Sequence, residues 1–377
     1  MKLKKFFAGV LAAAMMLTVG ATGAFAAGTQ PGSKITPNEG KAMVTLTKQL
    51  TVKSGVAPSG MKFEFKIEPG TANAAEHVVA GTVPTGYPNL SVTMTPAAGQ
   101  TYTAKPDTPY TAEFSFDLVE LLGGNATKLG KYAYTITEVE PNLPGITKDN
   151  DALNMVVSVV NADKDNPDGS HYAYYVALRK GTATEKAEGK FNNDYETNSL
   201  TLSKKVKGNF GDLGETFTFY VTFNKGDATK DYTDILFDKH GDGITITEKN
   251  GGAAATALTY GKDYAVTLKH GQDVQFTNIP NGVTYTIAED TTKADWQYTV
   301  SLESNPSVAL SNATTEGTVS ETATVTFIND HQGTPDMGVV LDNAPYIAML
   351  AIVAIGGVAL MLNLSLIHIS EPTRLLS

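Results

Sequence analysis

Apolar and polar residues alternate with a period of two through most of the middle of the chain. Val, Thr, Tyr, Phe and Leu supply the apolar positions, and Gly, Asn and Asp separate one alternating run from the next. This pattern is typical of β-strands with one buried face, because successive side chains of a strand point to opposite sides. Helix signals are scarce in the same region. The sequence therefore predicts an all-β protein.

One alternating run carries a glutamate on its apolar face, and this run occurs twice. Residues 132–138 read Tyr-Ala-Tyr-Thr-Ile-Thr-Glu, and residues 283–289 read Val-Thr-Tyr-Thr-Ile-Ala-Glu. In both, the position after the isoleucine on the apolar face is the glutamate, Glu138 or Glu289. A carboxylate that faces a core is costly unless it is paired or neutralised. Because the pattern is repeated, we expect a shared reason for it rather than two strand ends that turn to water.

Lysines also occupy apolar faces, again once in each half. Residues 43–50 and 200–206 are alternating runs in which Lys48 lies between Leu46 and Leu50 on one face, and Lys204 lies on the corresponding face of the second run. An aromatic alternating run follows each of them. The two halves of the chain therefore begin alike.

Each half closes on a strand that ends in Phe-x-Asn. The first closing stretch, residues 191–195, contains Asn193, and the second, residues 327–331, contains Asn329. The order Lys, Glu, Asn thus occurs twice. Taken singly, a strand lysine can extend its amine to water and an asparagine can begin a turn. The repeated order favours one common site in each half.

The spacing within the two halves indicates one inserted element. The lysine-to-glutamate distances nearly match (138 − 48 = 90 and 289 − 204 = 85), whereas the glutamate-to-asparagine distances differ (193 − 138 = 55 and 329 − 289 = 40). We therefore expect an extra hairpin in the first half, formed by the runs 153–160 and 171–178. The acidic loops 161–169 and 238–243 lack the spacing and the closing glutamate of a calcium loop, so both are interpreted as turns.

The repeat predicts two tandem all-β domains, at residues 34–197 and 198–332. The last strand of the first half runs almost directly into the first strand of the second, near Thr197. A linker this short limits relative motion and suits a rod.

Both ends of the chain carry targeting features. Residues 1–26 combine early lysines, an apolar stretch and Ala-Phe-Ala, as in an export signal peptide. Residues 344–363 predict a transmembrane helix, because nineteen apolar residues of helix span roughly 28 Å; the alternative is a buried helix. Residues 333–343 form a connector before it. Residues 364–377 resemble translated adapter or vector sequence and are treated as a non-native tail.

Composition excludes several classes of function. The net charge of −10 and the lack of a basic stripe disfavour nucleic acid as a partner. The chain has no cysteine, so it has no disulfide, thiolate metal site or cysteine nucleophile. The six histidines form no metal-spaced pair, and no nucleophile elbow or phosphate-binding loop is present. We therefore expect no metal, no cofactor and no surface enzyme.

A lysine, a glutamate and an asparagine that converge in an apolar core have a specific chemistry. Burial lowers the pKa of the lysine and raises that of the glutamate, which favours a neutral amine and a protonated carboxyl. The amine can attack the amide, while the glutamate polarises the carbonyl and carries protons to the departing ammonia. Fixed geometry supplies effective molarities of ~10⁵–10⁸ M. The product, a Lys–Asn isopeptide bond, would stabilise the fold by on the order of 4 kcal/mol.

Such bonds would join Lys48 to Asn193 and Lys204 to Asn329, with Glu138 and Glu289 as the proton carriers. Because each site would turn over once, on itself, this is not enzyme activity.

The chain resembles Gram-positive backbone pilins of the streptococcal type, which are built from Ig-like domains with intramolecular isopeptide bonds. The resemblance implies that the two predicted all-β domains are tandem Ig-like β-sandwiches. The match rests on the two lysine strands, on the "E-box" Tyr-x-Tyr-x-Ile-x-Glu at residues 132–138 and its variant at 283–289, and on the closing Phe-x-Asn-x-Tyr at 191–195. In the second closing stretch His331 replaces the tyrosine. The resemblance implies that the lysine and asparagine are bonded and that the glutamate is the catalyst.

The family's sorting signal is less well matched. Sortase substrates of this type carry a Leu-Pro-x-Thr-Gly-like pentapeptide before the apolar span. The corresponding residues here are Thr334, Pro335, Asp336, Met337 and Gly338. Methionine stands at the position of the acylated threonine, so we expect cleavage between the last two residues; the alternative is a connector with no sorting role.

The resemblance also implies an acceptor lysine for the next subunit. No Tyr-Pro-Lys-Asn pilin motif is present, and by position Lys186 or Lys190 is the candidate. The implied function is a structural pilus shaft subunit, exported to the surface of a Gram-positive cell and supporting adhesion. Its implied partners are sortase, identical subunits, peptidoglycan or a basal pilin, and the membrane transiently. The alternative is a monomeric wall-anchored adhesin or a minor pilin.

Overall fold

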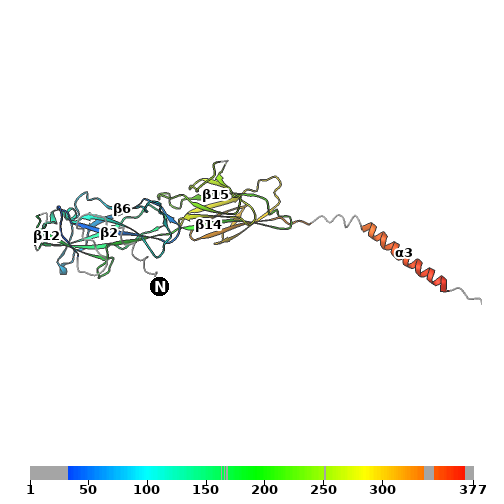
Figure 1. Cartoon of the computed structure of the whole chain (residues 1–377), viewed down its shortest axis with the longest axis horizontal. Coiled ribbons are helices and arrows are strands. Elements are labelled where there is room, and N and C mark those ends of the chain that lie inside the picture. The colour runs from blue at the N-terminus through cyan, green and yellow to red at the C-terminus, as the bar shows by residue number, and fades with distance from the viewer. Residues whose placement is uncertain are drawn as a thin grey trace, which may run out of the picture.

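The computed structural model describes residues 33–334 and 344–369, except 163, 165, 167, 168, 250 and 251. Two β-sandwiches lie end to end and form an elongated molecule, and a single long helix follows them in the chain (Figure 1). The predicted signal peptide, the predicted sorting residues from Pro335 to Gly338 and the end of the tail from residue 370 lie outside the described residues.

The first sandwich packs a seven-stranded sheet against a four-stranded sheet. The larger sheet has the order β1 (Ser33–Ile35), β12 (Tyr172–Lys180), β11 (Leu153–Asn161), β9 (Gly130–Glu138), β4 (Met61–Pro69) and β6 (Leu90–Met94), with β5 (Val78–Ala80) beside β9. The smaller sheet has the order β10 (Ile146–Thr147), β13 (Lys190–Tyr195), β2 (Met43–Val52) and β8 (Tyr110–Asp117). Two short strands, β3 (Val56–Ala57) and β7 (Tyr102–Thr103), pair separately, and the short helices are η1 (Ala74–Glu76), α1 (Leu118–Leu122) and η2 (Gly123–Asn125).

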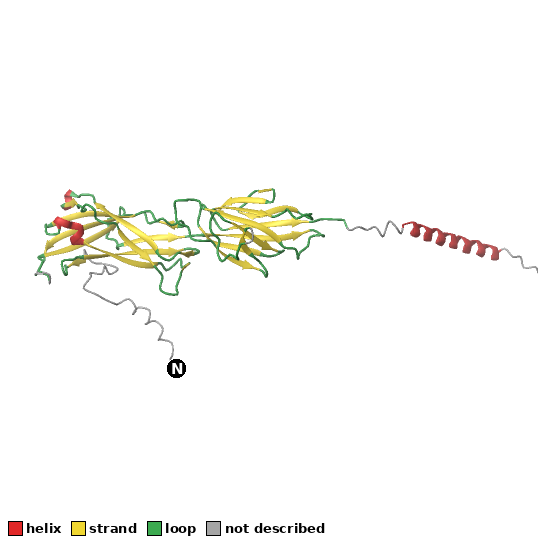
Figure 2. Ribbon diagram, turned by 90° about the horizontal axis from the view of Figure 1, so that it is seen from above, coloured by secondary structure: helices red, strands yellow, loops and turns green. Residues whose placement is uncertain are grey.

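The second sandwich is simpler and holds its own hydrophobic core. One sheet has the order β16 (Leu236–His240), β19 (Asp273–Ile279), β14 (Asn198–Lys207), β24 (Ala323–Asp330) and β21 (Thr299–Asn305). The other has the order β17 (Ile246–Glu248), β18 (Asp263–Leu268), β15 (Phe217–Asn224), β20 (Thr284–Glu289), β23 (Thr314–Thr318) and β22 (Leu310–Ser311). Figure 2 shows the strands of both sandwiches running along the long axis of the molecule.

The first and last main strands of each sandwich are parallel neighbours. In the first sandwich β2 pairs with β13, and Lys48 lies opposite Phe191. In the second, β14 pairs with β24, and Lys204 lies opposite Phe327. In each case the asparagine is two residues further along the partner strand, so it shares the lysine's face and lies diagonally across from it. The topology therefore brings together residues that are far apart in the sequence.

The alternation read from the sequence agrees with the burial of the strands. Every second residue of β2 is buried, and Lys48 occupies one of these buried positions. The hairpin expected in the first half is β11 and β12, which pair along their whole length and extend the larger sheet. The second sandwich has a shorter hairpin, β22 and β23, beside its glutamate strand β20, so the first half carries a longer hairpin rather than an additional one. The all-β prediction is confirmed.

The two sandwiches are joined by a short segment and by contacts on either side of it. Only two residues separate the end of β13 from the start of β14. The side-chain oxygen of Asn278 accepts the backbone N–H of Val56 across the junction at 3.1 Å. Gly55 has a φ of +72°, and a Cβ there would lie 2.0 Å from the hydroxyl of Thr197, so glycine is required at this crossing.

A second contact joins the sandwiches through Asn142 and Asp231. The backbone N–H of Asp231 donates to the carbonyl of Asn142 at 2.9 Å. The amide of Asn142 donates to the carboxylate of Asp231 at 2.7 Å. Several points of attachment therefore support the two-residue connection, as a stiff rod requires.

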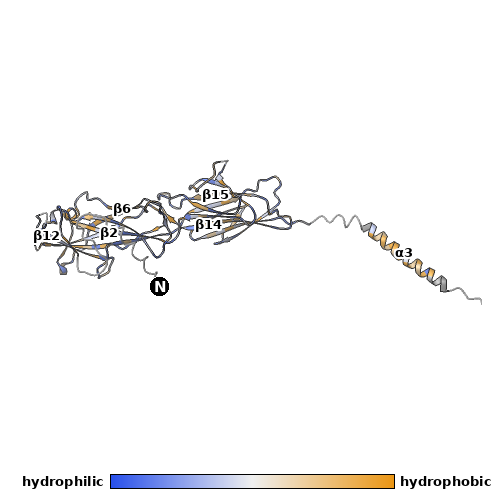
Figure 3. Cartoon of the chain, in the orientation of Figure 1, coloured by the Kyte–Doolittle hydropathy of each residue, from blue (hydrophilic) through white to orange (hydrophobic). Residues whose placement is uncertain are grey.

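The C-terminal helix α3 (Ala344–Ile369) is longer than the sequence predicts, by six residues. No glycine or proline interrupts residues 364–369, so the helix continues. Its segment Tyr346–Leu364 has a mean hydropathy of 2.4, is long and apolar enough to cross a membrane, and has no part buried against the rest of the described chain. Figure 3 shows the apolar colouring along its length.

Candidate functional site

The first predicted trio converges inside the first sandwich. The amine of Lys48, from β2, donates to Oε2 of Glu138 at 2.7 Å. The side-chain amide of Asn193, from β13, donates to Oε1 of the same carboxyl at 2.6 Å. All three residues are buried. One carboxyl thus bridges the amine and the amide.

The glutamate reaches this site from the opposite sheet. Glu138 is the last residue of β9, and its backbone pairs with Phe65 of β4. Lys48 and Asn193 come from the smaller sheet, on adjacent parallel strands. The trio therefore connects the two sheets through the core. A carboxyl on an apolar face is costly without a partner, and Lys48 and Asn193 are the partners of Glu138.

Aromatic rings enclose the trio. The Lys48 amine lies 4.8 Å from the centre of the Phe63 ring. The ring of Phe65 stacks on that of Phe114 at 4.4 Å and contacts that of Phe191 at 4.7 Å. These rings exclude water, so the charged forms of the amine and the carboxyl are poorly solvated.

The electrostatics of the site follow from this burial. Desolvation lowers the pKa of Lys48 to about 8, although the attraction of Glu138 opposes the shift. Desolvation also raises the pKa of Glu138, against the attraction of Lys48. Both shifts favour the neutral pair, a free amine beside a protonated carboxyl.

The second trio has the same arrangement in the second sandwich. The Lys204 amine donates to Oε1 of Glu289 at 2.7 Å, and the amide of Asn329 donates to the same oxygen at 2.8 Å. Phenylalanine rings again surround the amine, with the ring of Phe217 at 4.2 Å and that of Phe219 at 5.5 Å.

Burial has the same effects on the second trio. Desolvation lowers the pKa of Lys204 to about 8 and raises the pKa of Glu289. The two sites differ in their hydrogen bonds. In the first, the amine and the amide bond to different oxygens of Glu138, whereas in the second both bond to Oε1 of Glu289. Oε2 of Glu289 and Oδ1 of Asn329 are buried without a hydrogen-bond partner among the described residues.

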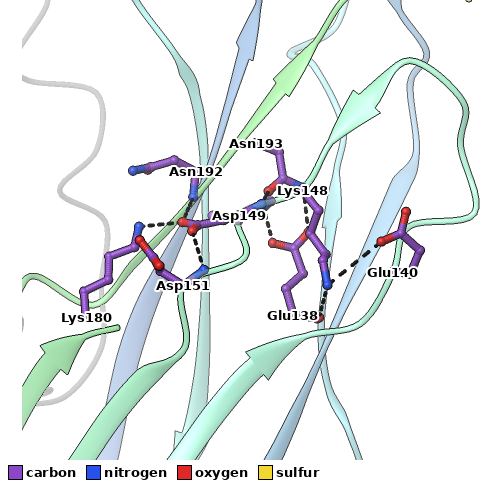
Figure 4. Close-up of polar contacts among 9 residues, drawn as sticks. Glu138, Glu140, Lys148, Asp149, Asp151, Lys180, Asn192 and Asn193 are labelled. Atoms are coloured by element: carbon purple, nitrogen blue, oxygen red, sulfur yellow. Dashed lines mark hydrogen bonds and ion pairs between the residues drawn. The ribbon is translucent and has the colours of Figure 1, made fainter. Parts of the chain in front are cut away.

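Sequence reasoning missed one residue beside the first trio, Asp149. It lies between β10 and β11, and its backbone N–H donates to Oδ1 of Asn193 at 2.9 Å (Figure 4). Its carboxylate accepts from the Lys180 amine at 2.5 Å and from the backbone N–H of Asn192 at 2.8 Å. Although desolvation opposes ionisation, these hydrogen bonds lower the pKa of Asp149. No pattern in the sequence singled it out, because its contact with Asn193 is made by the backbone.

The predicted sorting and acceptor residues lie apart from the trios. Lys190 begins β13 and forms an ion pair with Glu188. Lys186 is exposed in the loop between β12 and β13. Thr334 is exposed at the end of the described part of the second sandwich, and the rest of the sorting motif lies outside the described residues.

Comparison with known proteins gives matches along most of the chain. Residues 44–196 match the family described as a Spy0128-like isopeptide containing domain. Residues 198–331 match a domain of unknown function, DUF7601. A curated pilin from Streptococcus pyogenes serotype M1 is 31% identical over 353 residues, which cover 91% of this chain and 96% of that protein.

Solved structures agree with the sequence matches. The crystal structure of the major pilin from Streptococcus pyogenes is 27% identical and covers 78% of this chain and 99% of its own, with a TM-score of 0.52. The match spans both sandwiches, whose lysine and glutamate strands carried the resemblance seen in the sequence. The chain therefore belongs to the streptococcal-type backbone pilins, the structural subunits of the pilus shaft.

Proposed function

We propose that each sandwich of this pilin forms its own Lys–Asn isopeptide bond, between Lys48 and Asn193 in the first and between Lys204 and Asn329 in the second. The observation that carries the proposal is that one buried carboxyl holds an amine and an amide together, twice. A simple buried ion pair would need no asparagine at the same carboxyl.

The chemistry balances within each trio. A proton passes from the lysine ammonium to the glutamate, which leaves a neutral amine. The amine nitrogen attacks Cγ of the asparagine, a C–N bond forms and the carbonyl π pair moves to Oδ1. The carboxyl, Glu138 or Glu289, accepts a proton from the attacking nitrogen and delivers one to Nδ2. When the carbonyl re-forms, the bond to Nδ2 breaks and ammonia leaves. The proton first taken from the lysine ammonium leaves with the ammonia as ammonium, which returns the glutamate to its carboxylate. The glutamate is therefore catalytic, but each site reacts once.

Sorting and assembly are the second part of the proposal. The apolar helix α3 holds the exported precursor in the membrane, and sortase cuts between Met337 and Gly338. In the sequence, the motif follows the residues of β24 and precedes those of α3, which supports this order of events. The new C-terminus is joined to an acceptor lysine of an identical subunit, and at the base of the fibre to a basal pilin or to peptidoglycan. The product is a covalent shaft on the cell surface that supports adhesion.

Lys186 is the better of the two acceptor candidates. Its side chain is exposed in a loop, whereas the amine of Lys190 is already paired with Glu188. An acceptor amine must reach the active site of another protein, which an exposed loop permits.

In cells that carry the partner sortase, the wild-type protein should form a ladder of multimers that resist sodium dodecyl sulfate. The Lys186→Arg variant should lose the ladder and remain a monomer, because arginine keeps the charge but supplies no acylable amine. The matched control Lys190→Arg should keep the ladder. Immunoblots of wall extracts give the readout. A single wild-type monomer band would contradict assembly and favour the monomeric wall-anchored alternative.

A further inference from the structure

The amide of Asn193 is held at both ends. Its Nδ2 donates to Glu138 at 2.6 Å, and its Oδ1 accepts the backbone N–H of Asp149 at 2.9 Å (Figure 4). A backbone N–H only donates, so the atom that faces it must be the carbonyl oxygen. The leaving nitrogen therefore faces the glutamate, and the carbonyl oxygen faces a different donor.

The turn that carries this donor is fixed to the strand of Asn193. The carboxylate of Asp149 accepts the backbone N–H of Asn192 at 2.8 Å and the Lys180 amine at 2.5 Å, and its side chain is 8% exposed. The same carboxylate accepts the N–H of Asp151 at 3.1 Å, which closes the turn. The Asp149 N–H is thus tied to the residue next to the amide that it contacts.

The second sandwich has no such donor among the described residues. Oδ1 of Asn329 is buried and unpartnered. The strand that flanks β24 explains the difference. There β21 stays in register with β24 along seven residue pairs and passes Asn329 at Val300. In the first sandwich β10 pairs with β13 at only two positions and leaves the ladder before it reaches Asn193. The chain then turns, and the N–H of Asp149 meets the side chain instead.

We propose that the backbone N–H of Asp149 stabilises the oxyanion that develops on Oδ1 of Asn193, so that the first crosslink forms faster than the second. This rests on the proposed crosslink chemistry. When the Lys48 amine attacks, the carbonyl π pair moves to Oδ1, and a donor already aimed at that atom stabilises the charge. Glu138 is then free to give its proton to Nδ2, which leaves as ammonia. The Asp149 carboxylate is a positioning group, because it acts through its own N–H.

The test uses residues 27–333, which contain both cores and omit a helix that is not buried against them. After a short pulse of synthesis, peptide mass spectrometry follows each crosslink separately with time. In the wild type, Lys48–Asn193 should form faster than Lys204–Asn329, by on the order of 10²-fold. If the second crosslink forms as fast as the first or faster, the proposal is wrong.

Two variants separate the N–H from its anchor. Asp149→Ala keeps the N–H but loses the anchoring carboxylate, and should slow the first crosslink moderately. Asp149→Pro removes both and should slow it further, by on the order of 10²-fold relative to wild type. The second crosslink is the internal control and should keep its wild-type rate. Asp149→Asn still accepts from Asn192 and should recover most of the rate lost in Asp149→Ala.

The fold is checked in a background that cannot crosslink. Asp149→Ala and Asp149→Pro, each combined with Asn193→Ala, should melt close to Asn193→Ala alone. An unchanged first-crosslink rate in Asp149→Pro would overturn the proposal. If Asp149→Pro unfolds in that background, the proposal is decided by the rates of the two crosslinks in the wild type alone. Absence of ammonia loss at both wild-type sites would instead contradict the crosslink chemistry itself.

Discussion

Stretched from its two ends, the wild-type protein should gain almost no length from either sandwich, whereas the Asn193→Ala variant should gain roughly 500 Å when the first sandwich unfolds. The reason is that the applied force follows the covalent chain and takes the shorter route wherever a crosslink closes a loop. Load enters through β1 and β2 and leaves through β13, and the proposed bond between Lys48 and Asn193 would join β2 to β13 directly. The 144 residues between them (193 − 48 − 1) then stay outside the loaded path.

Single-molecule pulling measures this length, and the second sandwich is the control. In Asn193→Ala the bond between Lys204 and Asn329 remains, so only one extension event should appear. Asn329→Ala should show the complementary event, which releases the 124 residues between Lys204 and Asn329 (329 − 204 − 1), roughly 430 Å at full extension. An unfolding event of similar length in the wild type would show that its strands are not covalently joined.

The Glu138→Ala variant should be the least stable single variant of the first trio, and the second substitution Lys48→Met should restore part of the loss. Removing Glu138 prevents the crosslink, which costs on the order of 4–5 kcal/mol for a loop of this length. It also leaves the Lys48 amine buried without its partner, which costs about 3–5 kcal/mol more. Methionine is apolar and similar in length, so it removes the second cost but not the first.

Denaturant unfolding of the first sandwich checks this order. Asn193→Ala keeps the Lys48–Glu138 pair and should fall between the wild type and Glu138→Ala. The double variant Lys48→Met, Glu138→Ala should exceed Glu138→Ala by on the order of 3 kcal/mol. If adding Lys48→Met to Glu138→Ala lowers the stability further, the buried amine is not the cause of the loss.

The stability of Glu138→Ala should also depend on pH. Burial lowers the pKa of Lys48 to about 8 even with Glu138 present, from an ordinary 10.5. Without Glu138 the attraction that opposes this shift is gone. The unfolded state therefore binds more protons between about pH 8 and 10.5, and stability should rise with pH across that window. The Lys48→Met, Glu138→Ala variant should lack this rise.

The two trios are predictable from the sequence because their lysines and glutamates break the rule that buried strand positions are apolar. Lys48 and Glu138 occupy apolar positions of alternating strands, and Lys204 and Glu289 occupy the corresponding positions of the second half. A polar residue at a buried position implies a partner, and the repeated order of residue types identified it. The structure brings each trio together through the parallel pairing of the first and last strands.

Asp149 was not predictable in the same way. Its contribution comes from a backbone N–H that every residue except proline carries, and it depends on where β10 leaves its ladder with β13. The contacts across the junction, such as Asn278 with Val56, were also missed, because they join segments whose proximity only the packed sandwiches define. The extra turns of α3 were missed for a simpler reason: the tail was set aside as non-native, yet it contains no residue that ends a helix before Pro372.

The most direct test of the central claim is the intact mass of residues 27–333. The wild type should be lighter than its sequence by two ammonia molecules, one for each trio. Glu138→Ala and Glu289→Ala should each reduce the deficit to one ammonia molecule, and the double variant should show none. A wild-type mass equal to that of the sequence would contradict the account.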